Sequence, residues 1–119
     1  MRVFISSVIT GYEQFRDAVA AAVESLGHEV VRAEDFGALP ETPQQACLDG
    51  VRGADVVVLL AGARYGAVQA SGRSPTDEEY REARESKQVL VFVERVADRE
   101  PKQEALLAEV QGWANLPRL

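Results

Sequence analysis

Cysteine and histidine are almost absent from this chain, which has one of each among its 119 residues. One cysteine excludes an internal disulfide, and a single Cys with a single His leaves no ligand set for a structural zinc ion. We therefore expect no bound metal, no required cofactor, and a reducing cytoplasm as the compartment.

Long apolar runs and clustered positive charge are also missing. No apolar stretch approaches the ~20 residues that a membrane-spanning helix needs. The opening Met1–Ile5 is interrupted by Ser6 and Ser7 and has no cleavage pattern behind it, so a signal peptide is not expected. With 13 basic and 19 acidic residues the net charge is −6, the wrong sign for gripping a phosphate backbone. The sequence predicts neither a membrane nor a nucleic-acid partner.

What the chain does contain is an alternation of short apolar runs and amphipathic stretches. Its length suits one domain over residues 1–119, standing alone or as a module of a longer protein. Apolar, β-branched runs predict strands, and apolar positions three and four apart predict helices. The strands are expected at Val3–Ser6, Glu29–Ala33, Asp55–Ala61 and Gln88–Val93, and the helices at Gly11–Leu26, Pro43–Arg52, Pro75–Ser86 and Pro101–Ala114.

The apolar positions of three predicted helices indicate which side of each faces the core. The inward sets are Phe15, Val19, Ala22, Val23 and Leu26 in the first helix, Cys47, Leu48 and Val51 in the second, and Leu106, Leu107, Val110 and Trp113 in the last. Cys47 is interpreted as a buried small hydrophobic residue and not as a nucleophile, because no basic partner is evident near it.

Strands that alternate with helices indicate parallel βαβ units with right-handed crossovers. The predicted fold is therefore an α/β, three-layer, flavodoxin-like sandwich with about four parallel strands in the order 2-1-3-4. Ligands of such sheets bind at the carboxyl ends of the strands, where the direction of winding reverses. Ser6 and Ser7 follow the first strand and the segment Gly62–Gly66 follows the third, so one crevice should bring them together.

Glu79 is the candidate catalytic residue. The spacing places it one turn into the third helix, where the helix dipole favours an ionised carboxylate. A carboxylate held against a ribose can stabilise an oxocarbenium-like transition state. Two interpretations remain open. In one, Thr76 and Glu79 form a capping box; in the other, Ser74 caps the helix ahead of Pro75 and leaves Glu79 free.

The other candidates are ligand-binding residues, each with a purely structural alternative. Arg64 could hold a phosphate, or pair with a carboxylate of the third helix. Tyr65 could stack on a planar ring, or pack over the strand end. Gly62 and Gly66 would let the backbone approach a ligand closely, or supply turn conformations.

Hydroxyl groups complete the candidate site. They could hold a phosphate or a ribose, or cap a helix or turn. The first strand is not followed by G-x-G-x-x-G, so the dinucleotide fingerprint is absent. The hydroxyl-bearing candidates are Ser6, Ser7, Ser74 and Thr76.

Three motifs in order carry a resemblance to a known family: Val3-Phe4-Ile5-Ser6-Ser7, then Gly62-x-Arg64-Tyr65-Gly66, then Ser74-x-Thr76-x-x-Glu79-Tyr80-x-x-Ala83. From Met1 to about Arg95 the chain resembles the TIR-like domain of unknown function that commonly lies N-terminal to STAND NTPases and repeat proteins. The resemblance implies a TIR-like fold in the superfamily that includes nucleoside deoxyribosyltransferases.

The same resemblance implies a function. Enzymatic TIR domains cleave the N-glycosidic bond of NAD with a glutamate at the position of Glu79, next to which Glu78 is the near rival. The chain is thus predicted to be an NAD- or nucleotide-processing N-glycosidase, with NAD as candidate substrate. A non-catalytic nucleotide-sensing or protein-interaction module is the alternative, and deoxyribosyl transfer a further one. The loop Asp35–Pro43 is similar in placement to a TIR self-association loop, so self-association or contact with other domains is also expected.

Overall fold

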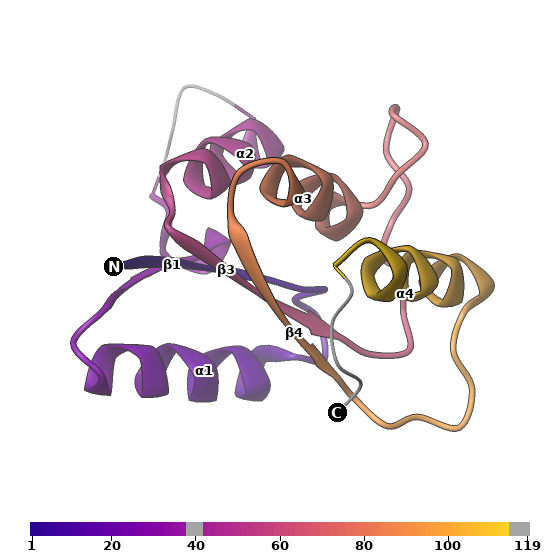
Figure 1. Cartoon of the computed structure of the whole chain (residues 1–119), viewed down its shortest axis with the longest axis horizontal. Helices are drawn as coiled ribbons and strands as arrows, with labels where there is room; N and C mark the ends of the chain where they lie inside the picture. Colours follow the sequence, from indigo (N-terminus) through magenta and orange to yellow (C-terminus); the bar gives the residue numbers. More distant parts are fainter. Residues whose placement is uncertain (38–41, 115–119) are drawn as a thin grey trace.

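One parallel sheet lies between two helical layers in the computed structural model, which describes residues 1–37 and 42–114, the last two by backbone alone. Figure 1 shows α1 on one face of the sheet and α2, α3 and α4 on the other. The elements in chain order are β1 (Arg2–Ser6), α1 (Glu13–Ser25), β2 (Glu29–Val31), the 3-10 turn η1 (Ala33–Asp35), α2 (Pro43–Gly53), β3 (Val56–Ala61), α3 (Pro75–Arg84), β4 (Gln88–Val93) and α4 (Pro101–Ala114).

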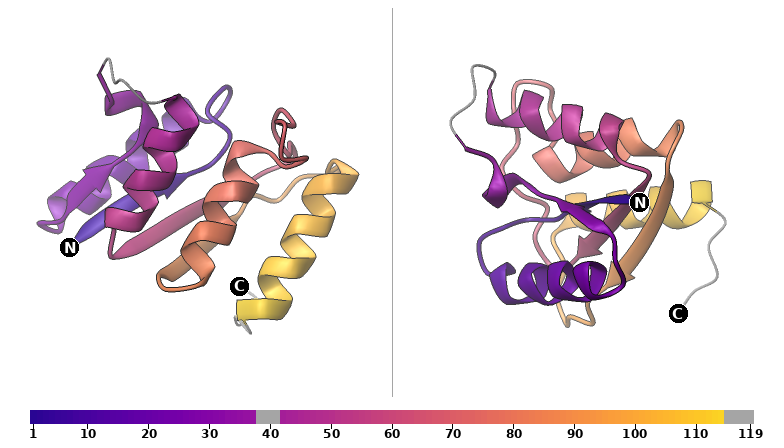
Figure 2. Two further views of the ribbon diagram at one scale, coloured as in Figure 1. Left: turned by 90° about the horizontal axis from the view of Figure 1, so that it is seen from above. Right: turned by 90° about the vertical axis from the view of Figure 1, so that its left-hand side faces the viewer.

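The strand order confirms the predicted flavodoxin-like arrangement. The strands lie in the order β2-β1-β3-β4, and every neighbouring pair is parallel. Viewed from above, α2, α3 and α4 run side by side across the sheet (Figure 2). The switch between β1 and β3 therefore lies beneath the N-terminal ends of α2 and α3, where a ligand crevice is expected.

Several element boundaries differ from the sequence prediction by one or two residues. The second strand ends at Val31 and not at Ala33, because residues 33–35 turn into η1. The amide of Asp35 donates to the carbonyl of Arg32 at 3.2 Å, and the Arg32 guanidinium binds the Asp35 carboxylate at 3.0 Å, so the turn is held twice. The first and third helices are also shorter at their ends than predicted, as fraying termini often are.

The predicted inward face of α1 is wrong in part. Val19 and Val23 do pack on the sheet, against β1 and β3. Phe15 and Leu26, however, are 51% and 74% exposed, and Ala22 is exposed too. The fully buried positions of this helix are instead Arg16 and Ala20. The helix is rotated so that an arginine, rather than a phenylalanine, points inward.

Both faces of the sheet carry apolar clusters, as the near-continuous apolar strands predict. On the α2–α3 side the buried cluster includes the predicted Cys47 and Val51, while Leu48 is half-buried. Leu106 and Val110 of α4 pack with Leu59 in a second cluster on that side. Leu107 is buried as predicted, whereas the side chain of Trp113 and residues 38–41 of the proposed self-association loop lie outside the described residues.

Coverage of the sheet is unequal, because α1 is the one helix that the described residues place on its face. Leu90 and Phe92 of the edge strand β4 share that face with Val58 and Leu60, their partners in register. They are 42% and 51% exposed. No described helix is long and apolar enough to cross a bilayer.

At Gly62, directly after β3, a larger residue would force neighbouring side chains to move. A Cβ built there would overlap the hydroxyl of Tyr12, which donates to the Glu94 carboxylate at 2.7 Å. The carbonyl of Gly62 accepts from Gln103 at 3.2 Å and from Arg99 at 3.3 Å. The end of the central strand thus contacts the N-cap of α1 on one side, and α4 and the segment before it on the other.

We expect Gly62→Ala to lower the free energy of unfolding by about 1–3 kcal/mol, since the added methyl forces Tyr12 aside. Urea titration measures this loss. Gly112→Ala, where nothing lies within 4 Å of the added Cβ, should cause none. In a Tyr12→Ala background the penalty should shrink; an undiminished penalty would contradict the overlap as its cause.

Candidate functional site

A cavity of about 470 Å³ lies at the carboxyl ends of β1 and β3. This volume falls within the range of small-molecule sites, roughly 300–1,000 Å³. Its walls come from the turn after β1, the loop after β3, and the first turns of α2 and α3, with Arg16 reaching in from α1. The cavity occupies the crevice predicted from the strand order.

Five of the nine predicted site residues line this cavity: Ser7, Arg64, Gly66, Thr76 and Glu79. Ser6 does not line the cavity, but its hydroxyl donates to the carboxylate of Glu79, which does. The remaining three do not line the cavity and make contacts within the protein instead: Gly62 with Gln103, Tyr65 with Asp77, and Ser74 with the start of α3. The structure therefore brings together a carboxylate, an arginine and two hydroxyls.

Glu79 is buried at the base of the site, with 5% of its surface exposed. The hydroxyl of Ser6 donates to its Oε1 at 2.7 Å, which joins α3 to the end of β1. Burial raises the pKa of Glu79 to about 7, against the opposing effects of the Ser6 hydroxyl and the Arg16 guanidinium. A carboxyl that titrates near neutrality and lines a cavity is typical of catalytic acids and bases.

The structure decides between the two capping alternatives. Ser74 is the N-cap of α3, and its hydroxyl accepts from the amide of Asp77 at 3.2 Å, with Pro75 at the first helical position. Glu79 does not return to Thr76; it bonds Ser6 instead. Because Ser74 satisfies the helix terminus, the carboxylate of Glu79 is free for the cavity.

Arg16, which sequence reasoning missed, is the most heavily bonded side chain near the cavity. It is 1% exposed. Its guanidinium donates twice to Glu34, at 2.6 and 2.7 Å, once to the Ser7 hydroxyl at 2.8 Å, and weakly to the carbonyl of Ile5 at 3.4 Å. This guanidinium lowers the pKa of Glu34. A two-pronged ion pair of this kind fixes the guanidinium plane firmly.

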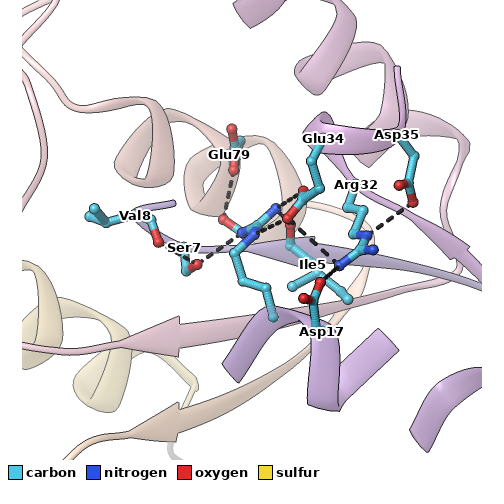
Figure 3. Close-up of polar contacts among 10 residues, drawn as sticks. Ile5, Ser7, Val8, Asp17, Arg32, Glu34, Asp35 and Glu79 are labelled. Carbon is cyan, nitrogen blue, oxygen red and sulfur yellow. Dashed lines mark hydrogen bonds and ion pairs between the residues drawn. The ribbon is translucent and has the colours of Figure 1, made fainter. Parts of the chain in front are cut away.

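The Arg16 pair extends outward into a wider charge network, drawn in Figure 3. Arg32 lies 3.7 Å from Glu34 and binds Asp17 at 2.8 Å and Asp35 at 3.0 Å. In the same view the hydroxyl of Ser7 donates a hydrogen bond to the carbonyl of Val8 at 2.8 Å. The network fixes the end of β1 at Ser6 and the start of the following turn at Ser7.

Arg64 and Tyr65 have separate surroundings. Arg64 is exposed at the rim of the cavity, where it donates to the carbonyl of Thr10 and lies over the Tyr12 ring at 6.0 Å. It makes no ion pair with α3. Tyr65 is buried in the cluster under α4, and its hydroxyl donates to Asp77. Of the two, Arg64 is therefore the residue with access to a ligand.

Cys47 lines the cavity from α2, as Glu79 does from α3. Burial, and next the charge of Glu79, raise the pKa of this thiol to about 12. The thiol therefore stays protonated at neutral pH, which agrees with its interpretation as a buried small residue and not a nucleophile. Among the described residues no group of three or more His, Cys, Asp and Glu side chains is arranged to hold a metal ion.

Sequence reasoning also missed Gln44 and Gln69, which line the cavity from α2 and from the loop after β3. Gln44 lies just after the Thr42 cap and Pro43, where a signal was available: helix N-termini next to a crevice present their first side chains to it. Arg16 had a signal too. It lies four residues before Ala20 and seven before Val23, so it shares their face of the helix.

The burial of Glu79 makes stability depend on pH. Its folded-state pKa of about 7 lies above the ordinary 4.5, so the folded protein binds an extra proton between these values and loses stability as pH rises through them. The loss attributable to this group is on the order of 3 kcal/mol. Urea titrations at pH 4.5, 6 and 7.5 should show a shallower decline in Glu79→Gln than in wild type. Glu24→Gln, at an exposed position of α1, should follow wild type; an identical decline in Glu79→Gln would contradict the assignment.

Comparison with known proteins places this geometry in context. Among solved structures, the chain is similar to that of the Clostridium botulinum CMP N-glycosidase BcmB, with 14% identity, a TM-score of 0.59, and coverage of 91% of this chain and 81% of that one. It is also similar to a prokaryotic SEFIR domain, with 13% identity, a TM-score of 0.58, and coverage of 94% and 96%. At such identities the likeness is one of fold.

Sequence comparison gives the family. No curated protein matches the chain significantly. A family model described as "Domain of unknown function (DUF4062)" matches residues 2–112, which include every element of the sheet and all the candidate site residues. The chain therefore belongs to the DUF4062 family.

Proposed function

We propose that this protein is a nucleotide N-glycosidase in which Glu79 acts on the ribose of NAD or of a nucleoside monophosphate. The observation that carries the proposal is Glu79 itself, a buried carboxyl at the strand ends with a pKa of about 7 that lines a ligand-sized cavity. Burying an ionisable carboxyl costs folding free energy, and carboxyls with pKa values shifted in this way are concentrated at functional sites. The similarity in fold to a CMP N-glycosidase supports the same reaction class.

The proposed reaction breaks the bond between C1′ of the ribose and the base nitrogen, and a water oxygen forms the new bond to C1′. The departing base takes a proton from that water; with the cationic nicotinamide of NAD the proton goes to solvent. As the bond to the base lengthens, positive charge develops on C1′ and the ring oxygen. Ionised Glu79 stabilises that charge, and it does so strongly because the carboxylate itself is buried.

The surrounding residues would hold the rest of the nucleotide. Ser6 orients the Glu79 carboxylate through its hydroxyl. Arg64, exposed at the rim, is available for a phosphate, whereas Arg16 is already committed to Glu34. Ser7 and Thr76 contribute hydroxyls to the cavity wall. Arg16 is therefore a positioning residue in this proposal and Arg64 a binding residue.

We expect purified protein to release nicotinamide from NAD or free base from CMP, and Glu79→Gln to lower kcat/KM at least about 100-fold, because the carboxylate charge is lost. Chromatography of the products measures both. Since enzymatic TIR domains tend to need assembly, the assay uses concentrated protein and an artificially oligomerised fusion. Glu85→Gln, exposed at the end of α3, is the matched control. Equal turnover by Glu79→Gln would remove this residue from the mechanism.

The pH profile of the reaction gives a separate test. If the ionised carboxylate acts, kcat/KM should rise with pH and level off above an inflection near 7. Ser6→Ala removes a hydroxyl that lowers the pKa of Glu79, so the inflection should move to higher pH. An inflection that stays in place would show that Ser6 does not act through Glu79.

A non-catalytic binding module is the second candidate, and one observation favours it. Glu79 is only 5% exposed and its Oε1 is already bonded by Ser6, so a ligand could occupy the cavity without reaching the carboxylate. Tight binding of ADP-ribose or NAD with no product would support this function. A covalent sugar adduct on Glu79 from a deoxynucleoside would instead indicate deoxyribosyl transfer.

A further inference from the structure

We propose that Gln44 makes the cavity selective for nucleobases that carry an exocyclic amino group, an inference that rests on the proposed nucleotide site. It arises from the contacts of Glu78, the residue before Glu79 in α3. The carboxylate of Glu78 accepts from the carboxamides of Gln44 and Gln69, and both of these residues line the cavity.

The nitrogen of the Gln44 amide is fully used by the protein. Its Nε2 donates to Oε1 of Glu78 at 2.9 Å and to the carbonyl of Pro75 at 3.3 Å. Both partners are acceptors only, so the amide cannot be turned over without placing its oxygen against a carboxylate. An amide nitrogen has two protons, and both are taken. The polar group that Gln44 can offer to a ligand is therefore its acceptor oxygen, Oε1.

Glu78 fixes the second amide in the same sense. Its Oε1 also accepts from Nε2 of Gln69 at 2.9 Å, and its other oxygen accepts from the Ser71 hydroxyl. Gln44 comes from α2 and Gln69 from the loop after β3, so one carboxylate aligns side chains from two separate segments. Gln69 keeps one free proton, whereas Gln44 keeps none. Gln44 can therefore only accept a hydrogen bond from a ligand, whereas Gln69 can also donate one.

The position of Gln44 suits a base whose ribose lies at Glu79. Gln44 and Cys47 are three residues apart on α2, a rise of about 4.5 Å along the helix axis. Both residues line the same cavity as Glu79. A ribose placed at Glu79 therefore leaves the wall at Gln44 for the attached base. Pro43 and Pro75, which also line the cavity, supply apolar surface beside that position.

An acceptor at this position discriminates by hydrogen bonding. Cytosine and adenine carry an exocyclic amine that can donate to Oε1. Uracil and hypoxanthine carry a carbonyl oxygen at the equivalent position, which would face Oε1 acceptor to acceptor. A partly buried polar group left unpaired discriminates far more strongly than a difference in size.

The test measures the dissociation constants of CMP and UMP, and of AMP and IMP, by calorimetry on the wild-type protein, with chromatography of each sample to detect cleavage. We expect at least one amino-bearing nucleotide to bind tenfold or more tightly than its carbonyl counterpart. In Gln44→Met, which keeps the length but not the acceptor, that ratio should fall towards one. Gln45→Met, at the neighbouring exposed position, should preserve the ratio.

A second variant guards against a misfolded Gln44→Met. Glu78→Gln leaves Gln44 intact but removes the carboxylate that fixes its orientation, so the ratio should relax there as well. Equal binding of both members of each pair, an unchanged ratio in both variants, or no binding of any nucleotide overturns the inference. Preferential binding without cleavage would uphold it while overturning the proposed turnover. Cleavage of all four nucleotides without preference would overturn this inference while upholding the proposed turnover.

Discussion

The buried guanidinium of Arg16 holds together the edge of the sheet at which the candidate site lies. Arg16 enters from α1 and meets Glu34 of η1, the hydroxyl of Ser7 and the backbone of Ile5. A charge with 1% of its surface exposed is tolerated only when it is paired and its hydrogen-bonding groups are satisfied. The segments that supply these partners are thereby fixed relative to one another. The end of β1 and the turn after it, with Ser6 and Ser7, are the parts most directly positioned.

Residues at the N-terminal end of α3 make contacts with several different parts of the protein. Ser74 closes the helix terminus, Asp77 receives the Tyr65 hydroxyl from the core, Glu78 aligns two amides, and Glu79 enters the site. Each side chain points in a different direction because successive residues of a helix are about 100° apart. The part of α3 that enters the site is therefore anchored on several sides.

The sequence carries the architecture well because the relevant signals are local. The apolar run of β3, the Ser-Pro start of α3 and the strand–helix alternation each lie within a few residues, and they predict the sheet order and the position of Glu79. The face of α1 was mistaken because hydrophobicity favours Phe15 over Arg16. The reason that Arg16 turns inward is Glu34, a partner 18 positions away that only the folded chain brings near.

The same distinction applies to the site residues. Ser7, Arg64, Gly66, Thr76 and Glu79 follow strands or open a helix, and all of them line the cavity. Tyr65 also follows a strand, but a core cluster and Asp77 hold it away. Gln44 depends on Glu78, 34 positions later in the chain. Pairings between distant segments are decided by packing, and no spacing rule within one segment reveals them.

The cap at Ser74 has a consequence for how homologous chains can differ in length. Because the helix starts wherever its cap lies, a residue gained or lost near the exposed Val68 leaves the helical phase untouched. A residue gained between Pro75 and Glu78 would instead swing every later side chain by about 100° and carry the site carboxylate out of the cavity. Insertions and deletions should therefore accumulate on one side of this serine and be excluded from the other.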